Sequence, residues 1–252
     1  NGQYQPSGDE VLAKMDAKPY KRLSALHGHQ RALIVSLGKS PMIVTQLYTL
    51  LSQSEGPGQS EGKEAASSVA TIALIYPGKD SEIGNTVTLL KPLLQKKKVK
   101  VYICPINEIS DIDSALACEH YSKVLTQVVE QIKVRHPEQI PTLSLAGGRK
   151  GMSVLTLFAA QRMGIDHLYH TVIRDPELEE KILKESSYEA LRSVSDMEKE
   201  RRLFLDAYGI DKFSLMRIPV MPLSVDGKTP DRKTLDSKTS GRKTPGHKTP
   251  GR

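Results

Sequence analysis

The sequence lacks tryptophan altogether and contains only two cysteines among its 252 residues. These two, Cys104 and Cys118, do not form a Cys-x-x-Cys pattern, which argues against a disulfide scaffold and against a cysteine-based zinc site. No stretch of about eighteen apolar residues occurs, and the N-terminal residues are polar rather than typical of a signal peptide. We therefore expect a cytoplasmic protein with no membrane segment.

The positive charge is concentrated at one end of the chain. The formal net charge is +7, and residues 228–252 contain five lysines and three arginines against two aspartates, which gives +6 for that segment. The rest of the chain therefore carries only +1. This distribution disfavours a globally basic surface that coats nucleic acid, so any anion site in the folded part must be local.

Residues 225–252 form a basic tail with an internal repeat. Five pentads begin with Lys-Thr, at Lys228, Lys233, Lys238, Lys243 and Lys248. Because this composition buries no apolar surface, we expect a disordered segment. Its function could be a weak nonspecific tether to nucleic acid or to an acidic partner. The alternative, which we favour, is a translated tandem repeat without a dedicated role.

Apolar runs of strand length alternate with amphipathic segments of helical length along most of the chain. This alternation requires crossover connections and predicts a Rossmann-like α/β fold, a parallel sheet with helices on both faces. The expected strands are residues 32–37, 69–76, 99–106, 141–146 and 167–173, with an edge strand at 213–223. The expected helices are residues 42–51, 83–97, 112–135 and 150–163.

The domain organisation follows from this pattern. Residues 1–28 are predicted to be a polar N-terminal arm, and residues 29–224 a single Rossmann-like domain. Within the domain, residues 52–68 have the composition of a flexible surface loop. The charged segment 177–207 has helical spacing and is expected to be a lid or an interface helix pair.

Two glycine-containing loops connect a buried strand to a helix. Ser36-Leu37-Gly38-Lys39-Ser40-Pro41 follows the first strand, and residues 146–153, with Gly147-Gly148-Arg149-Lys150-Gly151-Met152, follow the fourth. A helix N-terminus offers unsatisfied N–H groups, and glycine lets a phosphate approach the backbone closely. Two cations at a helix N-terminus oppose the helix dipole, which indicates a bound anion. The second loop is therefore a predicted phosphate site. For the first loop, a phosphate site and a plain turn are equally favoured.

The common nucleotide motifs are missing from both loops. Neither the dinucleotide pattern Gly-x-Gly-x-x-Gly nor the pattern Gly-x-x-x-x-Gly-Lys-Ser/Thr is present, which disfavours ordinary NAD or ATP binding. At the end of the second strand, Tyr76-Pro77-Gly78-Lys79-Asp80 either lines the site from the side or forms a simple turn. A generic Rossmann enzyme acting on another nucleotide stays open as a further interpretation.

With both loops in their strand-loop-helix context, the sequence resembles a CARF domain, the Rossmann-like sensor of type III CRISPR systems. The resemblance covers about residues 31–223 and rests on Val35 to Pro41 with the following helix, and on Gly147 to Met152 with its helix. Lys39 departs from the pattern, because a small polar residue is usual there. The resemblance implies a homodimer that binds a cyclic tetra-adenylate or hexa-adenylate across its two-fold axis.

The resemblance also implies an activity, because stand-alone CARF proteins resemble ring nucleases, which cleave the cyclic second messenger to linear products and so switch off type III CRISPR signalling. In that chemistry the ribose 2′-hydroxyl attacks the adjacent phosphate, and neither a metal nor another cofactor is required. By position, Arg149 and Lys150 would stabilise the phosphate charge, and Ser36 or Ser40 would orient the reacting groups. The ligand-binding positions implied are Gly38, Lys39, Gly147, Gly148, Gly151 and Met152. The alternative is a noncatalytic sensor that acts through a partner protein or nucleic acid.

Overall fold

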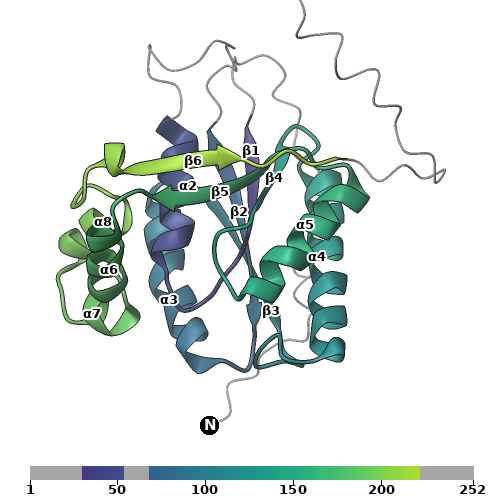
Figure 1. Ribbon diagram of the computed structural model, residues 1–252, viewed down its shortest axis with the longest axis horizontal. Helices are drawn as coiled ribbons and strands as arrows, with labels where there is room; N and C mark the ends of the chain where they lie inside the picture. The colour runs from purple at the N-terminus through teal and green to yellow at the C-terminus, as the bar shows by residue number, and fades with distance from the viewer. Residues whose placement is uncertain (1–29, 54–67, 222–252) are drawn as a thin grey trace, which may run out of the picture. The chain divides into compact units, whose positions relative to one another are not determined.

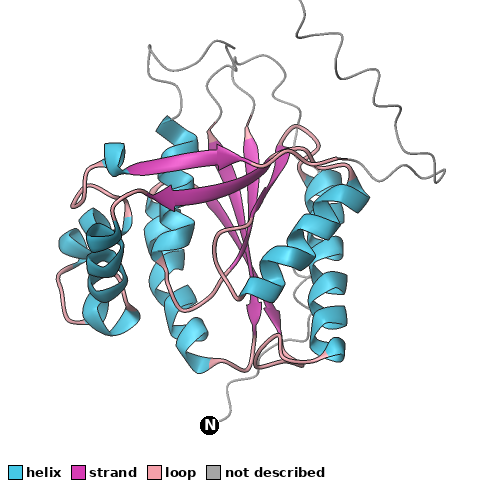
Figure 2. Ribbon diagram, viewed as in Figure 1, coloured by secondary structure: helices cyan, strands magenta, loops and turns pink. Residues whose placement is uncertain are grey.

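The computed structural model describes residues 30–53 and 68–221. The predicted arm at 1–28, most of the predicted loop at 52–68 and the predicted tail at 225–252 lie outside the described residues. No helix in the described ranges is long and apolar enough to cross a bilayer. The described chain forms an α/β sandwich, with a central sheet between layers of helices (Figures 1 and 2).

One six-stranded sheet organises the described residues, in the order β3-β2-β1-β4-β5-β6. Strands β1 to β5 run parallel, and β6 pairs antiparallel with β5 at the edge. The bounds of the strands are β1 (Arg31–Ser36), β2 (Val69–Pro77), β3 (Lys100–Ile106), β4 (Ile140–Ser144), β5 (Leu168–Ile173) and β6 (Phe213–Arg217). The predicted Rossmann-like α/β fold is confirmed, as is the position of the last strand at an edge.

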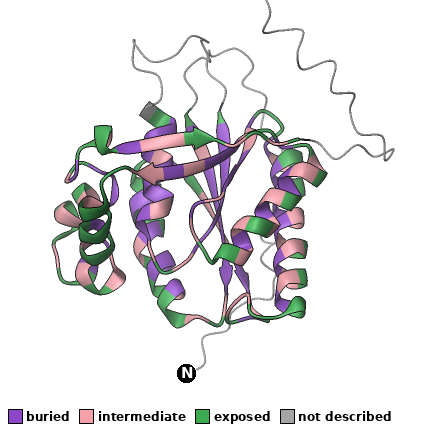
Figure 3. Cartoon of the chain, in the orientation of Figure 1, coloured by how far each residue is buried: buried purple, intermediate pink, exposed green. Residues whose placement is uncertain are grey.

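Alternate residues of the central strands face opposite layers of helices. In β1, Leu33 and Val35 pack with one core, whereas Ala32 and Ile34 pack with the other, as the two-residue period of a strand requires. The first core contains α2 (Met42–Gln53) and α3 (Ser81–Lys96), and the second contains α4 (Ala115–Arg135) and α5 (Lys150–Met163). Buried residues therefore run along both faces of the sheet (Figure 3).

The charged segment after β5 differs from its prediction. It contains three short helices rather than a pair: α6 (Pro176–Glu185), α7 (Tyr188–Arg192) and α8 (Asp196–Leu203). Leu191, Leu203 and Phe204 from this segment are buried in the same core as α2 and α3. The Thr45 hydroxyl of α2 also donates a hydrogen bond to the Leu203 carbonyl. The segment thus contributes buried residues to one face of the core.

The strand order defines where a ligand can bind. From β1 the chain continues to β2 on one side, whereas β4 lies on the other side of β1. In open α/β sheets this reversal creates a crevice beyond the carboxyl ends of the two central strands. The two glycine loops identified in the sequence follow β1 and β4, so both lie at this crevice.

Candidate functional site

The two glycine loops contact each other at the crevice. Gly147 and Gly148 have φ angles of +99° and +67°, a region that side chains rarely adopt. A Cβ at Gly147 would collide with the Ser36 carbonyl oxygen, and a Cβ at Gly38 would lie 3.2 Å from the Gly148 backbone. Glycine is required here because the two loops approach each other through their backbones. The loops therefore form one continuous surface.

Helix α5 begins at this surface. The first hydrogen bond at the start of α5 is donated by the Met152 N–H to the Arg149 carbonyl, at 2.9 Å. The N–H groups of Lys150 and Gly151 come before it in the chain and have no acceptor within the helix. Gly151 has its own structural reason, because a Cβ there would lie 3.2 Å from the Ile112 side chain. The segment between β3 and α4 thereby packs against the start of α5. This geometry leaves a helix N-terminus with its partial positive charge at the crevice.

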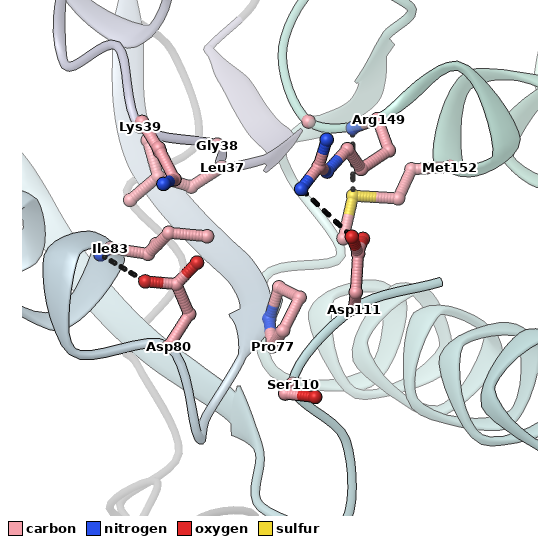
Figure 4. A pocket seen from close by; sticks show the side chains of 11 residues that line it. Leu37, Gly38, Lys39, Pro77, Asp80, Ile83, Ser110, Asp111, Arg149 and Met152 are labelled. Atoms are coloured by element: carbon pink, nitrogen blue, oxygen red, sulfur yellow. Dashed lines mark hydrogen bonds and ion pairs between the residues drawn. The ribbon is translucent and has the colours of Figure 1, made fainter. Parts of the chain in front are cut away.

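A cavity of about 300 Å³ lies beside the two loops. One side contains Arg149, Met152 and Asp111, and the other contains Lys39, Ile83 and Asp80 (Figure 4). This volume is at the lower end of the range for small-molecule sites. The complete lining is Leu37, Gly38, Lys39, Pro77, Asp80, Ile83, Ser110, Asp111, Gly148, Arg149 and Met152.

Both cations that line the cavity are paired with carboxylates. An Arg149 guanidinium nitrogen lies 2.8 Å from Asp111 Oδ2 (Figure 4), and the Lys39 ammonium pairs with Glu82. The hydrogen bond that Lys39 donates to the Glu82 carboxylate raises the pKa of Lys39 above its ordinary value, so this side chain stays charged. Arg149 and Lys39 are more than half exposed in these pairs. An incoming anion can therefore compete with the carboxylates for both cations.

Only part of the predicted site lines this cavity. Of the predicted ligand and catalytic positions, the lining contains Gly38, Lys39, Gly148, Arg149 and Met152. The remaining positions are not part of the lining; they are Ser36, Ser40, Gly147, Lys150 and Gly151. Gly147 and Gly151 instead make the close backbone approaches described above. Lys150 is exposed at the first position of α5, and Ser40 is partly exposed just before α2.

The Ser36 hydroxyl bonds into the protein interior. Ser36 is buried, and its Oγ shares a hydrogen bond with the Tyr121 hydroxyl of α4. The Tyr121 hydroxyl also bonds to Thr156 Oγ1 of α5 at 2.8 Å. Burial raises the pKa of Tyr121, so this phenol stays neutral. The three hydroxyls tie the end of β1 to both helices directly beneath Gly148, whose own Cβ position lies 3.2 Å from the Ser36 Cβ.

Three polar residues of the cavity were not predicted from the two loops. Asp80 belongs to the segment at the end of β2 that was left open between lining and simple turn, and both Pro77 and Asp80 line the cavity. Ser110 and Asp111 follow the end of β3 and were assigned no role. The signal that identifies them is positional, because the carboxyl ends of parallel strands meet at one edge of the sheet.

The fold and the position of the cavity define the protein first as a Rossmann-like α/β protein with a candidate ligand site at its switch point. The family model of CRISPR-associated protein NE0113 matches residues 69–241, which is more than half of the chain. The chain therefore belongs to this CRISPR-associated family, and the resemblance to a CRISPR-associated Rossmann-fold protein is confirmed.

Other comparisons are more distant. The solved structure titled "Enterococcus italicus Csm6 bound to cyclic hexa-2'-fluoro-hexa-dAMP" is similar with a TM-score of 0.49 and 9% sequence identity. The similarity covers 75% of this chain and 41% of that chain, so the present chain spans less than half the length of its structural neighbour. Among curated proteins, none matches the sequence.

Proposed function

We propose that this protein binds a cyclic oligoadenylate, cyclic tetra-adenylate in the first place, as part of type III CRISPR signalling. The observation that carries the proposal is the contact between the two glycine loops at the switch point of the sheet. Close backbone approach, a helix N-terminus and the cations Lys39 and Arg149 together suit a phosphodiester backbone. Membership of a CRISPR-associated family supports this choice among phosphate-containing ligands.

The proposed ligand has rotational symmetry, so the proposed binding unit is a homodimer. Each protomer would contribute both loops to the phosphates on its side of a two-fold axis. The local distribution of charge supports this arrangement. Because the chain outside residues 228–252 carries only +1, attraction to the ring must come from the loops themselves.

We propose further that the ring is cleaved without a metal ion. The 2′-oxygen of a ribose would attack the adjacent phosphorus, its proton would pass to solvent, and the bond from phosphorus to the 5′-oxygen would break. The 5′-oxygen would take up a proton, and the product would be linear with a 2′,3′-cyclic phosphate. Arg149 and Lys150 would stabilise the phosphate charge. Ser40 would orient the phosphate or the attacking hydroxyl, and Ser36 is the second candidate for that role.

A noncatalytic sensor is the alternative, and the interior position of Ser36 favours it. The Ser36 hydroxyl bonds to Tyr121, and Arg149 is engaged by Asp111. Both groups can thus hold the architecture of a binding site without taking part in chemistry. In this alternative the protein would respond to the ring and act through a partner protein or nucleic acid.

The test is incubation of the protein with labelled cyclic tetra-adenylate in the presence of EDTA. Conversion to linear products supports the ring nuclease. Intact ring, together with a raised melting temperature of the protein, rejects cleavage and supports the sensor. If the ring neither binds nor reacts, both proposals are wrong.

A matched pair of lysine variants tests the residue assignment. Lys150→Ala should abolish cleavage, because it removes the cation at the start of α5. Lys181→Ala removes an exposed lysine from α6 and should leave turnover unchanged. Equal rates in the two variants would remove Lys150 from the proposed mechanism.

A further inference from the structure

Part of the cavity lining is apolar, whereas the backbone of the two glycine loops beside it suits a phosphate. Leu37, Pro77, Ile83 and Met152 supply apolar surface, and they come from three segments far apart in the sequence. Apolar walls next to a phosphate-binding surface suit a flat nucleobase attached to the same backbone. Proteins that read an unpaired base enclose it between apolar side chains and bind the polar atoms on its edge.

Asp80 is the carboxylate of the cavity that has an oxygen available to accept a hydrogen bond from the edge of a base. Its Oδ1 caps α3 by accepting hydrogen bonds from Glu82 N at 2.9 Å and Ile83 N at 3.3 Å. Its second oxygen accepts no hydrogen bond from the described residues and is directed toward the cavity (Figure 4). A carboxylate can accept several hydrogen bonds, so capping leaves this oxygen available.

The other carboxylate in the lining is already engaged. Asp111 Oδ2 pairs with Arg149, and Asp111 Oδ1 accepts the N–H of Ile112 at 2.7 Å. The two carboxylates therefore differ: Asp111 is paired with Arg149 of the second glycine loop, whereas Asp80 lies on the opposite wall. The capping bonds hold Asp80 in place, which fixes the direction of its second oxygen before a ligand arrives.

We infer that Asp80 determines base specificity by accepting a hydrogen bond from the exocyclic amine of an adenine held between the apolar walls. This inference rests on the proposed function, because it assumes that the ligand is a cyclic oligonucleotide. Adenine presents an N6 amino donor, which a carboxylate accepts. Hypoxanthine presents a carbonyl oxygen at the same position, and two acceptors facing each other leave both unpaired.

The experiment compares binding of cyclic tetra-adenylate and cyclic tetra-inosinate, two rings whose bases differ at this exocyclic group and in the hydrogen that hypoxanthine carries on N1. The wild-type protein should bind the adenine ring at least about tenfold more tightly, a typical discrimination for one lost base-edge contact. Asp80→Asn keeps a capping oxygen on α3 and adds an amide donor that suits the inosine carbonyl. This variant should reduce the preference to less than about threefold.

Asp175→Asn is the matched control. Asp175 caps α6 in the same way, accepting from Glu177 N at 3.0 Å and Leu178 N at 3.2 Å, and it does not line the cavity. It should keep the wild-type preference. Equal binding of the two rings by the wild-type protein would overturn the role of Asp80 while leaving ring binding intact, and so would an unchanged preference in Asp80→Asn. Failure of both rings to bind would instead reject the proposed function.

Discussion

The ion pair between Arg149 and Asp111 gives the most informative prediction about affinity. Arg149 is the cation at the N-terminus of α5, and a nitrogen of its guanidinium lies 2.8 Å from Oδ2 of Asp111, which lines the same cavity. A phosphate must displace that carboxylate to bind Arg149 in full. Asp111→Asn removes the competing charge, while the amide oxygen can still accept the N–H of Ile112. This variant should therefore bind cyclic tetra-adenylate more tightly than the wild type.

The size of the effect follows from the exposure of the pair. Arg149 and Asp111 have side chains that are 64% and 32% exposed, so their pair contributes about 0.2–1 kcal/mol. Removing a negative charge at about 6 Å from a phosphate makes binding more favourable by a further amount of about 0.7 kcal/mol, which is the repulsion expected at the dielectric constant of water. Together these terms predict an affinity gain of about five- to eighteenfold at low salt. The gain should shrink as salt screens the charges.

Calorimetric titration at low and high salt measures this gain directly. Asp113→Asn is the control, because it makes the same charge change two residues away on an exposed side chain that does not line the cavity. It should change affinity by less than about twofold. Weaker binding by Asp111→Asn would show that Asp111 positions Arg149 rather than competing for it. Equal effects of the two variants would refute the argument as well.

Three further predictions concern stability. Gly148→Ala and Gly164→Ala both place alanine at a left-handed φ, of +67° and +63°, but only at Gly148 does the new Cβ meet other atoms. In urea denaturation, the free energy of unfolding should fall by about 1 kcal/mol in Gly164→Ala and by clearly more in Gly148→Ala. Equal losses would contradict the close approach of the loops. Tyr121→Phe leaves two buried hydroxyls without their shared partner and should lower the free energy of unfolding by about 1–3 kcal/mol, whereas no change would mean that the hydroxyl chain is not stabilising. Burial lowers the pKa of His136 below 6.5 in the folded protein, so the unfolded chain binds the proton more readily. The contribution of neutral His136 to stability is complete above pH 6.5 and is lost as the pH falls toward the folded pKa. The denaturation midpoint of His136→Gln should therefore fall less steeply with acid than that of the wild type, and equal pH dependence would contradict the assignment.

The succession of strands and helices along the chain could be predicted because short apolar runs alternate with amphipathic segments of helical length. The glycine loops could be predicted for the same local reason, since Gly38 and residues 147–151 stand between a strand and a helix. The helical segment at 177–207 was predicted as a lid or interface because its charges dominate the pattern. Its few apolar residues, such as Leu191 and Leu203, are the ones that fix it to the core.

The details of the site depend on contacts between distant segments, which local patterns do not encode. The pairing of Arg149 with Asp111 joins two separate crossover connections, as does the pairing of Lys39 with Glu82. The direction of the Ser36 hydroxyl depends on Tyr121, which is 85 residues away in the sequence. The sequence therefore predicts that the two glycine loops lie together at the edge of the sheet, whereas the structure identifies which side chains line the cavity and what holds them.

Titration of cyclic tetra-adenylate into the wild-type protein and into Arg149→Ala tests the central claim most directly. The control is Arg162→Ala, which removes an arginine further along the same helix, where it bonds to Thr126 at 2.8 Å. The account predicts saturable binding of one ring by two chains, weakened at least about tenfold by Arg149→Ala and unchanged by Arg162→Ala. Absence of binding to the wild type, or equal affinity of the wild type and Arg149→Ala, would contradict it.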